Sequence, residues 1–260
     1  MSTLVMKFGG SSLESPLSFS YCANIILRKS LKYKNIVVVI SAMKGTTNDL
    51  IDLAFKVNPS PQPREYDMLL SVGERISMSL LAMALAKKKR EAVSFTGSQT
   101  GIITCKSHSN AKIINVKPWR ILPHLKAGKI VIIAGFQGVS EKGEITTLGR
   151  GGSDTTAVAL GIALGACKVE FFKDVPGVFT EDPKRCKDSL LHSFLTYREA
   201  SEIVEKGACI LHKRSVSLAE RNKMPLHVMS FKEAYLSKRQ LGTLISSSEE
   251  FLPVSPIYEK

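Results

Sequence analysis

One stretch of the sequence combines residue types that bind anions. Residues 146–156, Thr-Thr-Leu-Gly-Arg-Gly-Gly-Ser-Asp-Thr-Thr, surround Arg150 with glycines and lead into the apolar run 157–166, which predicts a buried helix. Amides at a helix start are unsatisfied donors, and glycines let an anion approach them closely. The guanidinium of Arg150 adds a planar donor fork that suits a carboxylate or a phosphate. Taken alone, the stretch fits an anion site and a simple helix cap by Ser153, Asp154 and Thr155 equally well.

A second anion-binding pattern lies near the N-terminus. Residues 4–8 form a short apolar run interrupted only by Lys7, and the glycine turn 9–12 follows. A strand, a glycine turn and a helix over about residues 15–34 are therefore expected. The spacing is neither a P-loop nor a dinucleotide fingerprint. Lys7 stands where its ammonium could reach a terminal phosphate, although a lysine at a strand end is commonly only solvated.

Further candidate groups suit a small substrate. The β-branched run 36–40 predicts a strand covered on both faces, and Ser41 and Thr47 follow it, where ligands gather in open α/β sheets. Glu74 lies inside the helical pattern 65–89, and its carboxylate could bind a substrate ammonium. The structural alternatives are a helix cap by Thr46, Thr47 or Asn48 and a surface ion pair between the glutamate and the arginine that follows it.

The composition is that of an ordinary globular protein. The chain has 260 residues and a net charge of +13, but its lysines and arginines are scattered, and the dense basic run 87–90 falls where a helix should end. We interpret most of the basic side chains as solvated surface residues and a minor share as lining a site for anionic small molecules, and we expect no nucleic acid partner. Five cysteines without CxxC spacing indicate reduced thiols. From the N-terminal residues and the apolar runs we expect neither a leader segment nor a membrane-spanning segment. We therefore predict a soluble cytoplasmic protein.

Strands alternate with helices along the whole chain. Strands are predicted over residues 4–8, 36–40, 91–95, 130–134, 168–172, 226–229 and 242–245. A loop is expected over 96–101, a surface strand pair over 102–117 with His108 as a bystander, and a hairpin turn at 141–143. This order predicts a three-layer α/β/α sandwich around a mostly parallel sheet. One domain is expected over residues 1–245, followed over 246–260 by a polar tail or the start of a linker to further domains.

Five segments, in order, resemble the motif set of aspartokinases, which have the amino-acid kinase fold. They are Lys7-Phe8-Gly9-Gly10-Ser11-Ser12, Ser41-Ala42-Met43 with Thr47-Asn48, Gly73-Glu74-Arg75, the stretch 147–156, and Asp174-Val175-Pro176-Gly177-Val178. The resemblance covers roughly residues 3–245. It implies ATP-dependent phosphorylation, with Mg²⁺, of the side-chain carboxylate of L-aspartate to 4-phospho-L-aspartate. That reaction is the first step of lysine, threonine and methionine biosynthesis, the diaminopimelate route included.

The resemblance also implies roles for individual residues. Lys7 and Asp154 would be catalytic, with the aspartate organising the lysine and the Mg²⁺ shell, and no metal ligand is assigned directly. The acceptor would contact Ser41, Thr47, Glu74 and Arg150. The nucleotide would contact Lys7, Gly9, Gly10, Ser11, Gly152, Ser153, Lys173, Asp174, Phe179, Lys184, Cys209 and Ile210. Since a carboxylate with an ordinary pKa is ionised at neutral pH, the acceptor needs no general base.

The sequence departs from the family pattern mainly on the nucleotide side. Lys173, Phe179, Lys184 and Cys209 stand where aspartokinases usually carry Thr, Tyr, Arg and Lys. Family members continue into two regulatory ACT domains that this sequence does not include, so insensitivity to lysine, threonine and methionine is expected. A homodimer is a candidate assembly. The alternatives are a kinase of the same fold acting on glutamate, acetylglutamate or a nucleotide, and a non-catalytic regulatory subunit.

Overall fold

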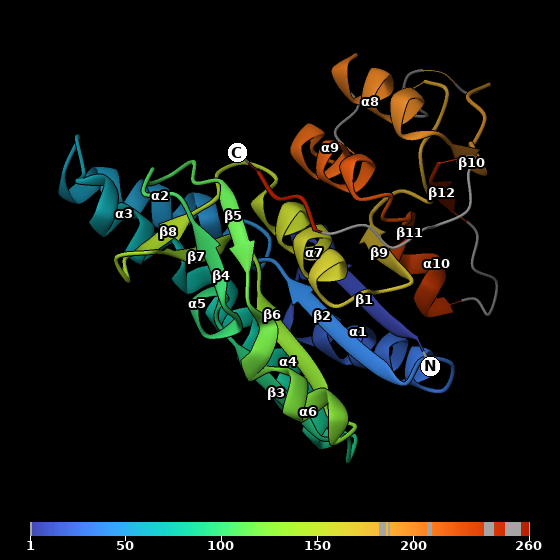
Figure 1. The fold of residues 1–260 in the computed structure, drawn as a ribbon, viewed down its shortest axis with the longest axis horizontal. Helices are drawn as coiled ribbons and strands as arrows, with labels where there is room; N and C mark the ends of the chain where they lie inside the picture. The colour runs from blue at the N-terminus through green and yellow to red at the C-terminus, as the bar shows by residue number, and fades with distance from the viewer. Residues whose placement is uncertain are drawn as a thin grey trace.

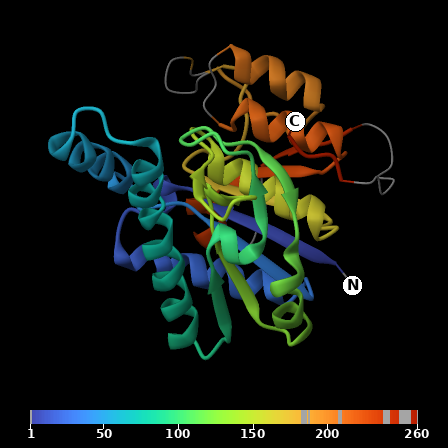
Figure 2. The same ribbon diagram turned by 60° about the vertical axis from the view of Figure 1, so that its left-hand side comes forward.

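The computed structural model describes residues 2–181, 186, 188–206, 210–236, 242–247 and 256–259. Lys184 and Cys209, both predicted nucleotide contacts, lie outside these residues. Within them, a large sheet is covered by helices on both faces, and a smaller sheet lies beside it (Figures 1 and 2). The predicted α/β/α sandwich is confirmed.

The large sheet has the strand order β10-β12-β11-β9-β1-β2-β6-β3. Its neighbouring strands run parallel except β11 and β12. In chain order its members are β1 (Thr3–Phe8), β2 (Asn35–Ile40), β3 (Ala92–Phe95), β6 (Ile130–Ala134), β9 (Lys168–Lys173), β10 (Phe194–Leu195), β11 (Leu226–Ser230) and β12 (Thr243–Ile245). The seven predicted strands are all present, and the two-residue β10 was not predicted because it is too short to show a period.

The helices follow the strands closely. They are α1 (Pro16–Ser30), α2 (Thr46–Val57), α3 (Pro63–Leu70), α4 (Val72–Lys87), α5 (Gly97–Thr100), α6 (Leu122–Lys126), α7 (Gly152–Ala163), α8 (Tyr197–Glu205), α9 (Lys213–Arg221) and α10 (Phe231–Leu236). Two 3₁₀ turns are η1 (Gly10–Ser12) and η2 (Pro118–Arg120).

Side-chain alternation along β1 decides what each face of the large sheet holds. Leu4, Met6 and Phe8 are buried in a core shared with α1, α4 and α10. Val5 belongs to the opposite core, which α7, α8 and α9 cover. In Figure 1, α7 lies in front of the sheet and α1 behind it. Lys7 has the parity of Val5, so its side chain projects on the α7 side.

The smaller sheet has the order β5-β4-β7-β8 and leads into the glycine stretch. Its strands are β4 (Ile102–Thr104), β5 (Ile113–Val116), β7 (Gln137–Ser140) and β8 (Ile145–Thr147). The predicted hairpin is confirmed, since β7 and β8 pair antiparallel. The predicted pair β4 and β5 is also antiparallel, but Ile102 and Ile113 are fully buried. This pair is therefore part of the core as well as of the surface.

The helix expected over about residues 15–34 ends at Ser30, and two other predicted segments have a different structure. The single helix expected over residues 65–89 is divided at Ser71, whose carbonyl accepts a hydrogen bond of 2.9 Å from Gln137 Nε2. The loop expected over 96–101 contains the short helix α5, because Thr96 and Gln99 form a capping box.

Part of the segment predicted as a polar tail or the start of a linker contacts the domain. Residues 256–259 pack on the domain: Glu259 Oε1 lies 2.7 Å from Arg214 Nε, and Ile257 exchanges hydrogen bonds with Asn222. Since these contacts are made by side chains far apart in the sequence, the composition of the segment could not reveal them.

The helical stretch Pro63–Lys87 is long and apolar enough, by length and composition, to cross a membrane. This differs from the prediction that no such run exists. In the fold, 39% of its apolar window is buried, and its carboxylates Asp67 and Glu74 lie inside the protein. A core helix passes the same test, so the stretch is weak support for a membrane span.

Candidate functional site

Lys7, Asp154 and Lys173 form a buried ion-pair cluster where β1 and β9 end. Lys7 Nζ lies 2.6 Å from Asp154 Oδ1, and Lys173 Nζ lies 2.9 Å from Oδ2. Lys7 and Asp154 are each 5% exposed. Since β1 and β9 are parallel neighbours, their ends deliver two ammonium groups to one carboxylate on the first turn of α7. Sequence reasoning paired the first lysine with Asp154 but assigned Lys173 only to the nucleotide.

Glycines make room for this arrangement. Gly151, the N-cap residue of α7, has φ +73°, and a Cβ there would lie 2.2 Å from the Cβ of His212. A Cβ on Gly135 would lie 2.8 Å from Ser153. Larger residues would push the start of α7 away from the ends of the strands, and Asp154 with it.

The charges of the cluster determine its protonation. Burial would raise the pKa of Asp154, but the ammonium groups of Lys173 and Lys7 together lower it to about 2. Burial lowers the pKa of Lys7, while Asp154 acts in the opposite direction. Asp154 is therefore ionised at neutral pH and serves as the counter-charge of two ammonium groups, and a carboxylate of such low basicity is a poor general base.

Glu74 lies beside this cluster on the first turn of α4. Its Oε1 accepts a hydrogen bond of 3.1 Å from the Ala42 amide, while Oε2 is buried without a hydrogen-bond partner among the described residues. Gly73 permits the approach, since a Cβ there would lie 2.8 Å from the Cβ of Ala42. Burial raises the pKa of Glu74 to about 7, although the Ala42 amide and Lys7 lower it. A buried carboxylate with a free oxygen can accept a cationic group from a ligand.

The surface ion pair considered for Glu74 is wrong. Glu74 is only 4% exposed, and Arg75 instead donates from Nε to Gln137 Oε1 at 3.2 Å. The helix cap considered for Thr47 is also wrong, because Gly45 is the N-cap residue of α2.

The remaining predicted acceptor residues lie on adjoining loops. Ser41 follows β2 directly and its amide donates to the Phe8 carbonyl at 3.1 Å, which ties the ends of β2 and β1 together. Thr47 lies half-buried in the first turn of α2. Arg150 is exposed in the loop before α7. Burial lowers the pKa of His212, the charge of Arg150 adds to this lowering, and the charge of Asp154 opposes it. Their contacts with substrate remain predictions.

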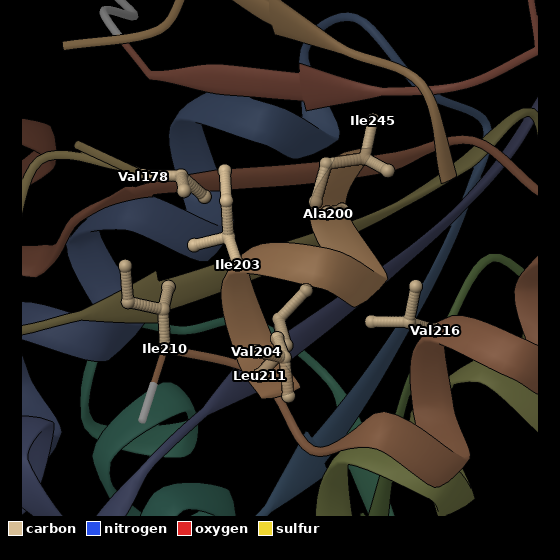
Figure 3. Close-up of a pocket in the computed structure, with 8 residues that line it drawn as sticks. All are labelled: Val178, Ala200, Ile203, Val204, Ile210, Leu211, Val216 and Ile245. Atoms are coloured by element: carbon tan, nitrogen blue, oxygen red, sulfur yellow. The ribbon is translucent and has the colours of Figure 1, made fainter. Parts of the chain in front are cut away.

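The predicted nucleotide residues fall into two groups. Gly9, Gly10 and Ser11 follow β1, and Gly152 and Ser153 begin α7, so all five adjoin the ion-pair cluster. Asp174, Phe179 and Ile210 lie farther along the chain, after β9 and before α9. Asp174 is exposed, and Phe179 forms a bridge with Leu191. Ile210 lines a small apolar cavity together with Val178, Ile203 and Ile245, among others (Figure 3).

Sequence reasoning missed two side chains that hold the glycine stretch. Asp67, on α3, is fully buried and contacts Thr147 and His108, which was wrongly expected to be a bystander. Arg214, on α9, donates from Nη1 to the Leu148 carbonyl. An aspartate in an apolar helical pattern was an available signal for the first, whereas nothing in the local sequence marks the arginine.

The described residues include no group of three or more His, Cys, Asp or Glu side chains able to hold a metal ion. Both oxygens of Asp154 face ammonium groups. The site therefore does not fit a protein-held Mg²⁺ cage. Mg²⁺ commonly binds through substrate phosphates and water, so an ion that accompanies a nucleotide would be held mainly by these.

The comparison with known proteins agrees with this fold. The profile of the Amino acid kinase family matches residues 2–230, and the chain belongs to that family. An aspartokinase of Geobacillus stearothermophilus is 46% identical over 260 residues, covering 99% of this chain and 63% of that relative. The chain thus spans less than two thirds of the relative it matches.

Solved structures of similar proteins have the same fold. The aspartate kinase from Synechocystis has a TM-score of 0.83 and 38% identity, covering 97% of this chain and 40% of its own. E. coli aspartokinase III, in complex with aspartate and ADP, has a TM-score of 0.83 and 27% identity, covering 95% of this chain and 65% of its own.

Proposed function

We propose that this chain is the catalytic domain of an aspartate kinase, a transferase that moves the γ-phosphoryl group of ATP to the side-chain carboxylate of L-aspartate. The similarity to aspartokinases over nearly the whole chain supports this class. The observation that carries the acceptor assignment is the buried Glu74 carboxylate, whose Oε2 has no hydrogen-bond partner among the residues that the structure describes.

An acceptor with an ammonium group fits Glu74 best. The ammonium would supply the missing partner of Oε2 and draw the carboxylate into its ionised form. Neither a nucleotide nor acetylglutamate has an ammonium group. With such an acceptor the Glu74 carboxylate would stay buried without a partner, which costs free energy. Arg150, at the start of α7, would bind the α-carboxylate, and Ser41 and Thr47 would donate neutral hydrogen bonds. Glutamate remains the nearest alternative, and similarity to aspartokinases favours aspartate.

The phosphoryl group would pass between two anions at the Lys7 cluster. Lys7 and the amides of Gly9 and Gly10 would neutralise charge on the phosphates as it develops. Asp154 holds the Lys7 ammonium in place and, being ionised, maintains its charge against burial. The acceptor carboxylate is already a nucleophile, so these residues position and neutralise without moving a proton. Mg²⁺ would enter with ATP and supply further charge neutralisation.

The remaining proposed nucleotide contacts lie beyond the phosphate-binding turn. Lys173 is the last residue of β9, and Asp174, Phe179 and Ile210 lie between β9 and α9, whereas Lys184 and Cys209 lie outside the described residues. We infer one catalytic unit over residues 1–245. The four described cysteines, Cys22, Cys105, Cys167 and Cys186, are free thiols, which supports a cytoplasmic enzyme. A homodimer remains the candidate assembly.

A coupled ADP-release assay over L-aspartate, L-glutamate, N-acetylglutamate and UMP tests this function. L-aspartate should give the highest kcat/KM, and a product that reacts with hydroxylamine would identify an acyl phosphate. Faster turnover of acetylglutamate or UMP would contradict the acceptor assignment. No turnover with any acceptor would favour the non-catalytic subunit.

A further inference from the structure

Asp67 is a fully buried carboxylate that the phosphoryl chemistry does not use. Its oxygens accept from His108 Nδ1 at 2.8 Å, from the Ser109 amide at 3.0 and 3.1 Å, and from the Thr147 amide and hydroxyl at 3.0 and 2.6 Å. Because a carboxylate only accepts, Nδ1 of His108 carries the proton. One side chain of α3 thus holds both the loop before β5 and the end of β8.

These contacts adjoin the loop that carries Arg150. Thr147 is the last residue of β8, three positions before the arginine. Gly149 has φ +73°, and a Cβ there would lie 3.0 Å from the Ser109 carbonyl, so the loop packs on a residue that Asp67 also holds. From the other side, Arg214 binds the Leu148 carbonyl. The segment is therefore held on two sides before it enters α7.

The other end of the connection is the helix pair α3 and α4. Asp67 precedes Glu74 by seven residues, across the joint at Ser71. Gln137 fastens this joint to β7, since it donates to the Ser71 carbonyl and accepts from Arg75. Glu74 and Arg150, which we propose to contact the acceptor, thus lie on separate segments that are linked through Asp67.

We propose that Asp67 is a positioning residue that sets the spacing between the ammonium-binding Glu74 and the carboxylate-binding Arg150. It touches no reacting atom and acts through Thr147 and Ser109. The ammonium and the α-carboxylate of an amino acid are bonded to the same carbon, so both contacts form only at one spacing, and a change in it weakens acceptor binding more than nucleotide binding. The proposal rests on the proposed function for its substrate, and its structural half can be tested without substrate.

Asp67→Asn places an amide donor against donors of Ser109 and Thr147. Asp67→Asn should raise the KM for aspartate by about tenfold or more, while the KM for ATP stays within about twofold. Thr147→Val removes only the hydroxyl contact and keeps the shape, so it should raise the KM for aspartate by a smaller factor.

Glu170→Gln is the matched control: Glu170 is equally buried but pairs with Lys29 and Lys168 at the opposite end of the sheet. This variant should lose thermal stability without any change in KM.

Hydrogen–deuterium exchange of residues 145–152 without ligands separates this inference from the proposed function. Exchange should be faster in Asp67→Asn and Thr147→Val than in wild type, and unchanged in Glu170→Gln. Unchanged exchange in both variants would overturn the positioning role even if the wild-type chain phosphorylates aspartate. Faster exchange with an unaltered KM for aspartate would overturn the link to the acceptor.

If Asp67→Asn does not fold, the exchange and the KM of Thr147→Val decide alone. A wild-type chain without kinase activity refutes the function, while exchange still tests the positioning.

Discussion

Two buried clusters, each a carboxylate between two lysines, lie at opposite ends of β9. The carboxyl-end cluster consists of Asp154 with Lys7 and Lys173, and the amino-end cluster of Glu170 with Lys29 and Lys168. In each, one ammonium lies 2.6 Å and the other 2.9 Å from its nearest carboxylate oxygen. The two clusters share these distances, although Lys29 contacts both oxygens of Glu170 while Lys7 and Lys173 contact different oxygens of Asp154.

Their surroundings differ. The carboxyl-end cluster adjoins a glycine turn, the start of α7 and the free oxygen of Glu74. The amino-end cluster lies between α1, β9 and β11, beside His227, whose pKa burial lowers to about 4, so that its imidazole is neutral at pH 7. A buried ion pair is weak support for stability or function by itself. The glycine turn and the buried Glu74 oxygen without a hydrogen-bond partner among the described residues support our proposal that the carboxyl-end cluster serves a ligand.

The largest expected effect separates the clusters by activity. Lys7→Met should lower kcat by about 10²–10³-fold, because a charge that neutralises the transferring phosphoryl group is lost. Lys29→Met, which also leaves its carboxylate with one remaining lysine, should keep kcat within about twofold. Steady-state kinetics of both variants measure this. Equal losses would mean that the two clusters act only through folding.

The next effect separates the clusters by their carboxylates. Glu170→Gln should lower the free energy of unfolding by about 3 kcal/mol, since it leaves Lys29 buried without its counter-charge. Asp154→Asn should cost stability of the same order and also most of kcat. Urea denaturation and turnover rates, measured on the same preparations, test both. An Asp154→Asn enzyme with normal kcat would remove this residue from the catalytic machinery.

The smallest effect is a pH dependence. Burial raises the pKa of Glu74 to about 7, above its ordinary value of 4.5, so the folded protein binds this proton more tightly than the unfolded chain. The resulting stabilisation is complete below about pH 4 and is lost as the pH rises through 7. Only the ionised form pairs with an ammonium, so the KM for aspartate should fall about tenfold between pH 6 and pH 8.

Glu74→Gln should show no such trend and should raise the KM for aspartate far more than that for ATP. The KM for ATP in wild type serves as the internal control across the same pH range. A KM for aspartate that is independent of pH in wild type, or a Glu74→Gln variant that keeps the wild-type trend, would show that Glu74 does not read the ammonium.

Much of the site was predictable because parallel strands end at one edge of a sheet. Lys7 lies at the end of a predicted strand, Ser41 directly follows another, and the stretch 146–156 leads into a predicted helix. Each could therefore be assigned to that edge from the sequence alone. Lys173 was assigned to the nucleotide, and its shared contact with Asp154 was missed. That contact depends on β9 lying next to β1, an order that local patterns do not encode.

The sequence by itself determined the strands, most of the helices, the fold class and the glycine turns, because these depend on periodicity and on local backbone preferences. Only the tertiary structure decided which carboxylates are buried and what they meet. Asp67 and Glu74 occur in the same helical pattern, yet the first is satisfied by Ser109, His108 and Thr147 while the second keeps a free oxygen. Their different roles arise from desolvation and from partners tens of residues away, which no local sequence window contains.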